Sequence, residues 1–221
     1  MLRAMLLDDT VTSTTSALIA ASAQGFALTC GLIVAIGAQN AFLLRQGLRR
    51  EHVGPIVAFC TLADAVLMAA GVAGLASLIG ERPGLAHALA GAGALFLLAY
   101  GLRALWQARA PGALQATARA GLTRRQALAQ VAGFTLLNPH VYLDSVLLIG
   151  SIGAQQPGAP GRTAFVSGAV LASGLWFTGL GYGARRLAPL FARPRAWQVL
   201  DGLVGLTMLA LASRVAPMAW A

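Results

Sequence analysis

The stretch FTLLNPHVYLDSVLLIG, from Phe134 to Gly150, is apolar over most of its length, yet it contains a proline, a histidine and a carboxylate. Its composition predicts a helix inside a membrane, where an unpaired backbone group is costly. Pro139 has no N–H and clashes with the carbonyl group of Thr135, so it interrupts such a helix. The His140 ring and the Asp144 carboxylate are four residues apart, which is the spacing of one helix face. The stretch therefore predicts a broken helix whose polar groups either serve a function or pack against other helices.

The composition of the whole chain is that of a membrane protein. Of its 221 residues, 57% are hydrophobic and 10% are charged, whereas soluble domains are about 25% charged. The mean hydropathy is +0.72. Barrel strands would be shorter and would alternate, so we predict an all-α polytopic membrane protein with about six transmembrane helices. The six apolar runs are Ser16–Leu44, Val53–Gly80, Gly84–Trp106, Ala127–Ala154, Thr163–Ala184 and Ala196–Val215.

The net charge of +9 comes from sixteen arginines. In a soluble protein this excess would indicate a nucleic-acid partner, but here the arginines lie between apolar runs, where they anchor helix ends. We therefore predict a lipid bilayer as partner and no nucleic acid. Twelve arginines follow the first, third and fifth runs, which places those loops in the cytoplasm and both termini outside if all six runs span. The other four are Arg3, Arg82, Arg162 and Arg214.

The runs divide the chain into two halves. We predict a polar N-terminal leader over residues 1–15, a first three-helix repeat over 16–108, a cytoplasmic linker over 109–126 and a second three-helix repeat over 127–221. Three is an odd number, so tandem copies would insert as inverted repeats with opposite orientations. Gly179 and Gly183 form a GxxxG pair, a spacing typical of closely packed membrane helices.

Each half opens with an interrupted helix. The first run contains Gly37, Gln39 and Asn40 at the place where the fourth run contains Asn138 and Pro139. Matching interruptions in inverted halves are typical of the binding site of a secondary transporter. A broken helix presents an N-terminal end that favours a carboxylate and free carbonyl groups that favour a cation, and an amino acid carries both. The alternative is a proline kink packed against neighbouring helices.

Two carboxylates lie well inside apolar runs, Asp64 and Asp144. A central aspartate costs roughly 3 kcal/mol in a membrane, so both are candidate site residues. Asp201 is expected near the membrane interface, beside Arg193 and Arg195. Two nearby carboxylates do not readily both ionise, so we expect the pair to share a proton that a cationic substrate would release. A static structural pair of acids is the alternative.

Other chemistries find little support in the sequence. The two cysteines form no CxxC motif and the three histidines are scattered, so we predict no metal site and no cofactor. Neither an HExxH motif nor a nucleophile paired with a base is present, which argues against an enzyme. His140 could carry protons beside Asp144, or it could cap the carbonyl groups freed by Pro139.

Three segments carry a resemblance to a known family: GAQNAFLLRQGLRREHV (37–53), CTLADAVL (60–67) and GFTLLNPHVYLDSVLLIGS (133–151). They resemble the LysE-type exporters of L-lysine and L-arginine over about residues 25–215. The resemblance implies a multi-pass protein of the bacterial inner membrane that exports basic amino acids, driven by the membrane potential or by proton antiport. Export of a metal cation, as in other members of the superfamily, is the alternative. The choice between arginine and lysine and the formation of a homo-oligomer stay open.

The same resemblance implies a set of site residues. It places the paired helix-breaking motifs at Gln39–Asn40 and Asn138–Pro139, and the acid pair at Asp64 and Asp144. Together with the broken helices, these residues predict a binding site for the substrate and protons. The predicted set is Gln39, Asn40, Asp64, Asn138, His140, Tyr142 and Asp144, with helix breaks at Gly37 and Pro139.

Overall fold

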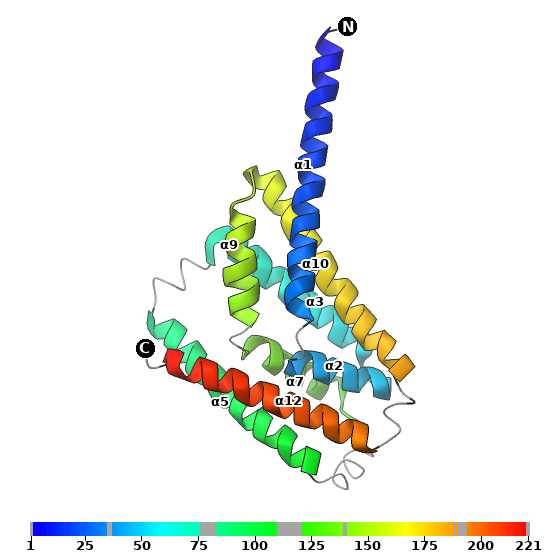
Figure 1. Cartoon of the computed structure of the whole chain (residues 1–221), viewed down its shortest axis with the longest axis vertical. Coiled ribbons are helices and arrows are strands. Elements are labelled where there is room, and N and C mark those ends of the chain that lie inside the picture. The colour runs from blue at the N-terminus through cyan, green and yellow to red at the C-terminus, as the bar shows by residue number, and fades with distance from the viewer. Residues whose placement is uncertain are drawn as a thin grey trace.

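The computed structural model describes residues 2–34, 37–75, 83–109, 121–138, 141–187, 189 and 194–219. All regular structure within these ranges is helical, which confirms the all-α class of a polytopic membrane protein (Figure 1). Three described helices have the length and hydropathy of membrane spans: Thr14–Ile33, Val53–Gly74 and Gly158–Arg186. Shorter apolar helices cover Ala94–Trp106 and Tyr142–Ala154.

The helices follow the apolar runs, but the first and fourth runs are split. The main helices are α1 (Leu2–Ile33), α2 (Ala38–Arg49), α3 (Val53–Ala70), α5 (Pro83–Arg109), α7 (Arg124–Leu136), α9 (Ile149–Ala154), α10 (Gly158–Gly183) and α12 (Pro194–Val215). Shorter helical segments are η1 (Gly71–Leu75), η2 (Tyr142–Leu148), η3 (Ala184–Leu187) and η4 (Ala216–Ala219). Both predicted interruptions therefore fall between helices, one between α1 and α2 and the other between α7 and η2. Residues 2–15 of the predicted leader form the first turns of α1, which projects beyond the other helices (Figure 1).

Hydrogen bonds fix the start of α7 and connect it to the turn between α2 and α3. The Thr123 hydroxyl accepts from the Gln126 backbone N–H at 3.2 Å, and the Gln126 side chain accepts from the Thr123 N–H at 3.0 Å, which is a capping box at the start of α7. Arg50 and His52 both have positive φ in the turn between α2 and α3. The His52 ring lies 2.6 Å from the Leu122 carbonyl oxygen, which ties this turn to the start of α7.

Each half contributes helices that pack on the other half. α2 packs against α10, while α7 packs against α3, and α5 lies alongside α12 (Figure 1). The aromatic rings of Phe42, Phe96, Tyr100 and Phe134 join α2, α5 and α7, with the Tyr100 and Phe134 centroids 4.5 Å apart. The core thus spans the two halves and does not lie within either one.

Glycines allow the closest helix contacts. A Cβ atom on Gly168 of α10 would lie 1.9 Å from the Ser22 carbonyl oxygen of α1, and one on Gly25 of α1 would lie 2.1 Å from the Phe165 carbonyl oxygen. By contrast, a Cβ atom on Gly179 or Gly183 would meet nothing within 4 Å. The prediction that this GxxxG pair packs closely is wrong for the described chain. The close crossing of α1 and α10 lies nearer the N-terminal end of α10, at Gly168.

Candidate functional site

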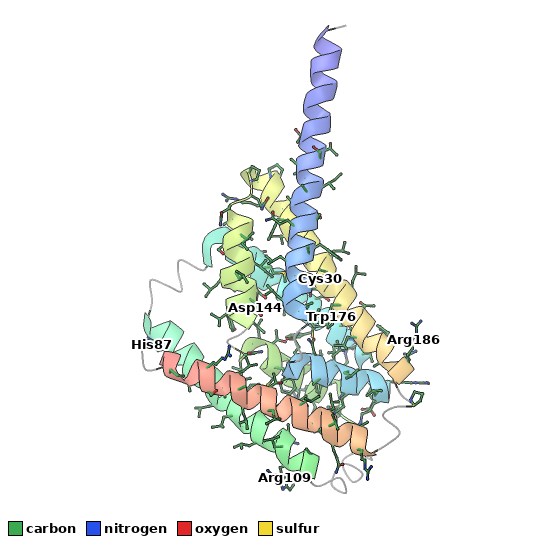
Figure 2. All side chains as sticks on the ribbon, in the orientation of Figure 1. Cys30, His87, Arg109, Asp144, Trp176 and Arg186 are labelled. Atoms are coloured by element: carbon green, nitrogen blue, oxygen red, sulfur yellow. The ribbon has the colours of Figure 1, made fainter. Side chains whose placement is uncertain are left out.

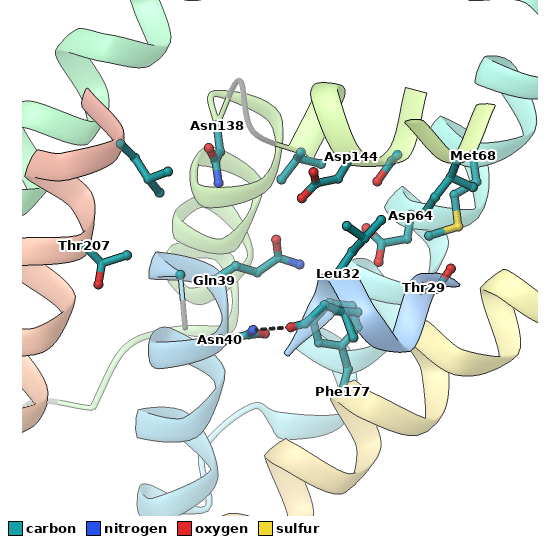
Figure 3. A pocket seen from close by; sticks show the side chains of 16 residues that line it. Thr29, Leu32, Gln39, Asn40, Asp64, Met68, Asn138, Asp144, Phe177 and Thr207 are labelled. Atoms are coloured by element: carbon teal, nitrogen blue, oxygen red, sulfur yellow. Dashed lines mark hydrogen bonds between the residues drawn. The ribbon is translucent and has the colours of Figure 1, made fainter. Parts of the chain in front are cut away.

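A cavity of about 160 Å³ lies where the broken helices of the two halves meet (Figure 3). Its walls come from α1, α2, α3, α10 and α12, together with residues around the break between α7 and α9. Half of the described lining is polar, which is unusual at the centre of an apolar bundle. These polar residues are Thr29, Gln39, Asn40, Asp64, Asn138, Asp144, Ser145 and Thr207.

The first helix break is held by the amide of Asn40. Asn40 Nδ2 donates to the Ile33 carbonyl oxygen at 3.0 Å, so it satisfies a backbone group at the end of α1. Its Oδ1 accepts from the Trp176 indole N–H of α10 at 3.3 Å. Because both ends of the amide are engaged, Asn40 fixes the geometry of the break at the cavity wall.

The second break brings polar groups to the opposite wall. Asn138 is 7% exposed and lines the cavity, as does Asp144 in η2. Tyr142 is not part of the described lining; its hydroxyl donates to the Leu136 carbonyl oxygen at 2.8 Å. This hydrogen bond bridges the break between α7 and η2. Pro139 and His140 lie outside the described residues.

Asp64 is the most enclosed acid of the cavity. It is 6% exposed, and its Oδ2 accepts a hydrogen bond of 2.7 Å from the hydroxyl of Ser173 on α10. Ser173 itself is fully buried. The bond crosses from the first half to the second, so it fixes the Asp64 carboxylate relative to both halves.

The structure thus brings most of the predicted site residues to one place. Gly37, Gln39, Asn40, Asp64, Asn138 and Asp144 all line this cavity. Figure 3 shows the two carboxylates and the Gln39 amide facing the same space. The groups that the sequence analysis missed are mainly hydroxyls on apolar helices, which carry no distinctive pattern: Thr29, Ser145, Ser173 and Thr207, with the Trp176 indole.

A third acid of the apolar runs pairs with an arginine of the other half. Asp201 was expected beside Arg193 and Arg195 near the membrane interface; the residue is 1% exposed and its carboxylate forms an ion pair with Arg45 of α2. Asp64 and Asp144 are therefore not the only acids enclosed in the bundle. The pair forms because α2 and α12 are in contact, and a cation from the other half reaches Asp201. Asp201 lies outside the described cavity lining.

The electrostatics of the lining are one-sided. Its described residues include two carboxylates and no arginine. Elsewhere in the described ranges, no group of three or more histidine, cysteine or acidic side chains is placed to hold a metal ion. The cavity is therefore a small polar site that favours a cationic ligand with further hydrogen-bonding groups.

Comparison with known proteins gives consistent matches over most of the chain. The profile of the LysE type translocator family matches residues 30–218. The putative amino-acid transporter YggA of Aeromonas salmonicida is 45% identical over 201 residues, which are 89% of this chain and 96% of the relative. A putative amino-acid transporter of Mycobacterium tuberculosis is 45% identical over 181 residues, 82% of this chain and 89% of the relative. The arginine exporter protein ArgO of Salmonella typhimurium is 39% identical over 194 residues, 87% of this chain and 92% of the relative. No solved structure matches the chain.

Proposed function

The chain belongs to the LysE type translocator family, and from this premise we propose that it exports the basic amino acids arginine and lysine across the bacterial inner membrane. Membership makes it a multi-pass membrane transporter and not an enzyme. An arginine exporter is among its relatives.

The observation that carries the proposal is the pair of acids in one cavity. Asp64 and Asp144 line the same space, so a ligand in this cavity meets two carboxylates. A cationic side chain entering a membrane protein needs such a partner, because a lone charge in the bilayer is costly. A basic amino acid carries a second positive charge on its side chain, which a neutral amino acid lacks, so it can pair with both carboxylates at once.

We propose that protons are the coupling ion. Moving one positive charge outward against 100 mV costs roughly 2.3 kcal/mol, and one proton moving inward cancels this electrical term. A proton shared by Asp64 and Asp144 would be released when a cation binds, because the cation stabilises both ionised carboxylates. The cationic substrate and the proton then compete for the same two carboxylates.

We further propose that the two halves act as inverted repeats over residues 16–108 and 127–221, joined by a cytoplasmic linker over 109–126. The exchange of contacts supports this, since α1 and α2 of the first broken run pack on α10, as α7 and η2 of the second broken run pack on α3. Rocking of one repeat against the other would then expose the cavity to each side in turn. The arginines associated with the first, third and fifth runs support the proposed orientation; Figure 2 shows Arg109 at the foot of the molecule and Arg186 at its right edge.

Transport by inside-out membrane vesicles tests the proposed function. Export appears in such vesicles as accumulation of labelled arginine or lysine when a proton gradient is imposed. Vesicles without the protein and vesicles with the Asp64→Asn variant serve as controls. Accumulation of a divalent metal ion in place of both amino acids would favour the alternative, a cation exporter, and would overturn the proposal.

A further inference from the structure

The broken first helix presents two unlike ends to the cavity, and this polarity bears on how a substrate lies in it. Resting on the proposed function, we propose that the first turn of α2, together with the side-chain amide of Gln39, binds the α-carboxylate of the substrate. The amino acid is then recognised by its carboxylate at α2 and by its positive charges at the aspartates.

The start of α2 is open toward the cavity. Gly37 is its N-cap residue, has an extended backbone and supplies no side-chain cap. The first N–H groups of a helix have no partner within the helix, and they form its positive end. Gly37 lines the cavity, and a Cβ atom on it would meet nothing within 4 Å. Space for a ligand therefore lies directly at the N-terminus of this twelve-residue helix.

Gln39 supplies the second observation. Its side chain is 9% exposed, lines the cavity and reaches into it from α2 (Figure 3). Among the described residues its Nε2 meets no oxygen or nitrogen acceptor, and it lies beside the thiol of Cys60, which is only a weak acceptor. A buried amide donor without a strong acceptor is unfavourable unless a ligand completes its hydrogen bonding. A carboxylate at the start of α2 would complete it.

The other side of the break is the C-terminal end of α1, where the helix presents carbonyl oxygens and not N–H groups. α1 ends at Ile33 beside the same cavity, so its last carbonyl groups form a negative helix end. Thr29 of α1 is 1% exposed and lines the cavity, yet its hydroxyl has no hydrogen-bond partner in the part of the chain that the structure describes. Thr135 and Thr163 instead donate to the carbonyl group four residues earlier, at 2.9 Å each. The Thr29 hydroxyl and the Asp64 carboxylate line the same cavity and suit the α-ammonium group, so the head group of a bound amino acid would lie across the break.

This arrangement predicts that a positive side chain alone is insufficient for binding. Agmatine is arginine without its carboxylate, so it keeps the guanidinium group and loses the proposed contact with α2. Arginine methyl ester keeps the size of the head group and removes its negative charge. Both compounds should bind the wild-type protein at least tenfold more weakly than arginine.

The test measures counterflow of labelled arginine in proteoliposomes that contain the full-length protein. Unlabelled arginine and agmatine compete with the label, and each gives a half-inhibitory concentration. Gln39→Met removes the amide donor at nearly constant length. We expect it to raise the value for arginine at least tenfold and to change the value for agmatine less than twofold. Gln46→Met is the matched control, because Gln46 is a buried glutamine of α2 outside the cavity lining. It should keep the wild-type ratio of the half-inhibitory concentrations of arginine and agmatine.

The outcomes separate the inference from the proposed function. A wild-type ratio of arginine to agmatine in Gln39→Met overturns the carboxylate site and leaves basic amino acid export standing. Absence of both arginine and lysine counterflow in the wild-type protein overturns the proposed function, and the inference with it. Should Gln39→Met fail to fold, the wild-type protein still decides: equal competition by arginine, agmatine and the methyl ester overturns the carboxylate site.

Discussion

The buried ion pair between Arg45 and Asp201 joins α2 of the first half to α12 of the second, and its two partners are unequally enclosed. The Asp201 side chain is 2% exposed and that of Arg45 is 21% exposed. One carboxylate oxygen of Asp201, Oδ2, has no hydrogen-bond partner among the described residues. Asp201 therefore depends on Arg45 for its neutralisation, while Arg45 keeps partial access to its surroundings.

The unequal burial of the two partners determines how much stability each substitution removes. Arg45→Met leaves a carboxylate buried without a counter-ion, which costs about 3–5 kcal/mol. Asp201→Asn leaves an arginine that can turn outward, so we expect only about 1–3 kcal/mol. A chain of this length shifts its melting temperature by about 2–4 °C for each kcal/mol, so Arg45→Met should lower it by about 6–20 °C. The double variant Arg45→Met/Asp201→Leu removes both buried charges and should recover most of the loss.

The assay is thermal unfolding of the detergent-solubilised protein, followed by tryptophan fluorescence. Arg214→Met is the control, because Arg214 is an exposed arginine near the end of the same α12, and it should leave the melting temperature unchanged. The reasoning is refuted if Asp201→Asn melts below Arg45→Met, or if the double variant melts below both single variants.

Three further predictions concern packing, orientation and the second helix break. Gly168→Val should separate α1 from α10 and lower the melting temperature, whereas Gly179→Val should not, because only the first glycine meets backbone of another helix; equal melting of the two variants would contradict this. A membrane-impermeant thiol reagent added outside cells should label Gln156→Cys and miss Arg125→Cys, and the reverse pattern would invert the proposed orientation. Asn138→Leu removes a cavity amide and should reduce arginine export sharply at an unchanged protein level, so normal export would exclude a role for this side chain.

The residues that the sequence analysis placed correctly in space are polar or charged groups whose burial in a membrane costs free energy. Asp64 and Asp144 interrupt apolar runs, and Gln39, Asn40 and Asn138 accompany residues that break a helix. Such groups must meet one another or a ligand, because hydrocarbon offers them no partner. Their convergence on one cavity could therefore be anticipated from a single sequence.

The remaining features depend on which helices touch. Ser173 is one hydroxyl in an apolar helix, and its importance becomes visible only from its hydrogen bond to the Asp64 carboxylate on another helix. The burial of Asp201 follows from the contact of α12 with α2, which local charge patterns do not encode. Likewise, a chain with 26 glycines offers many close-packing motifs, and only the crossing of α1 with α10 selects Gly25 and Gly168.

The acid pair is the centre of the account, and its direct test is arginine transport by Asp64→Asn, Asp144→Asn and the double variant, measured in proteoliposomes at equal protein content. Each substitution nearly preserves volume and removes a charge that the cavity offers to a cation. We predict that both single variants and the double variant fall to background while remaining in the membrane. Full transport by either single variant, or recovery of transport in the double variant as expected for a static structural pair, would contradict the account.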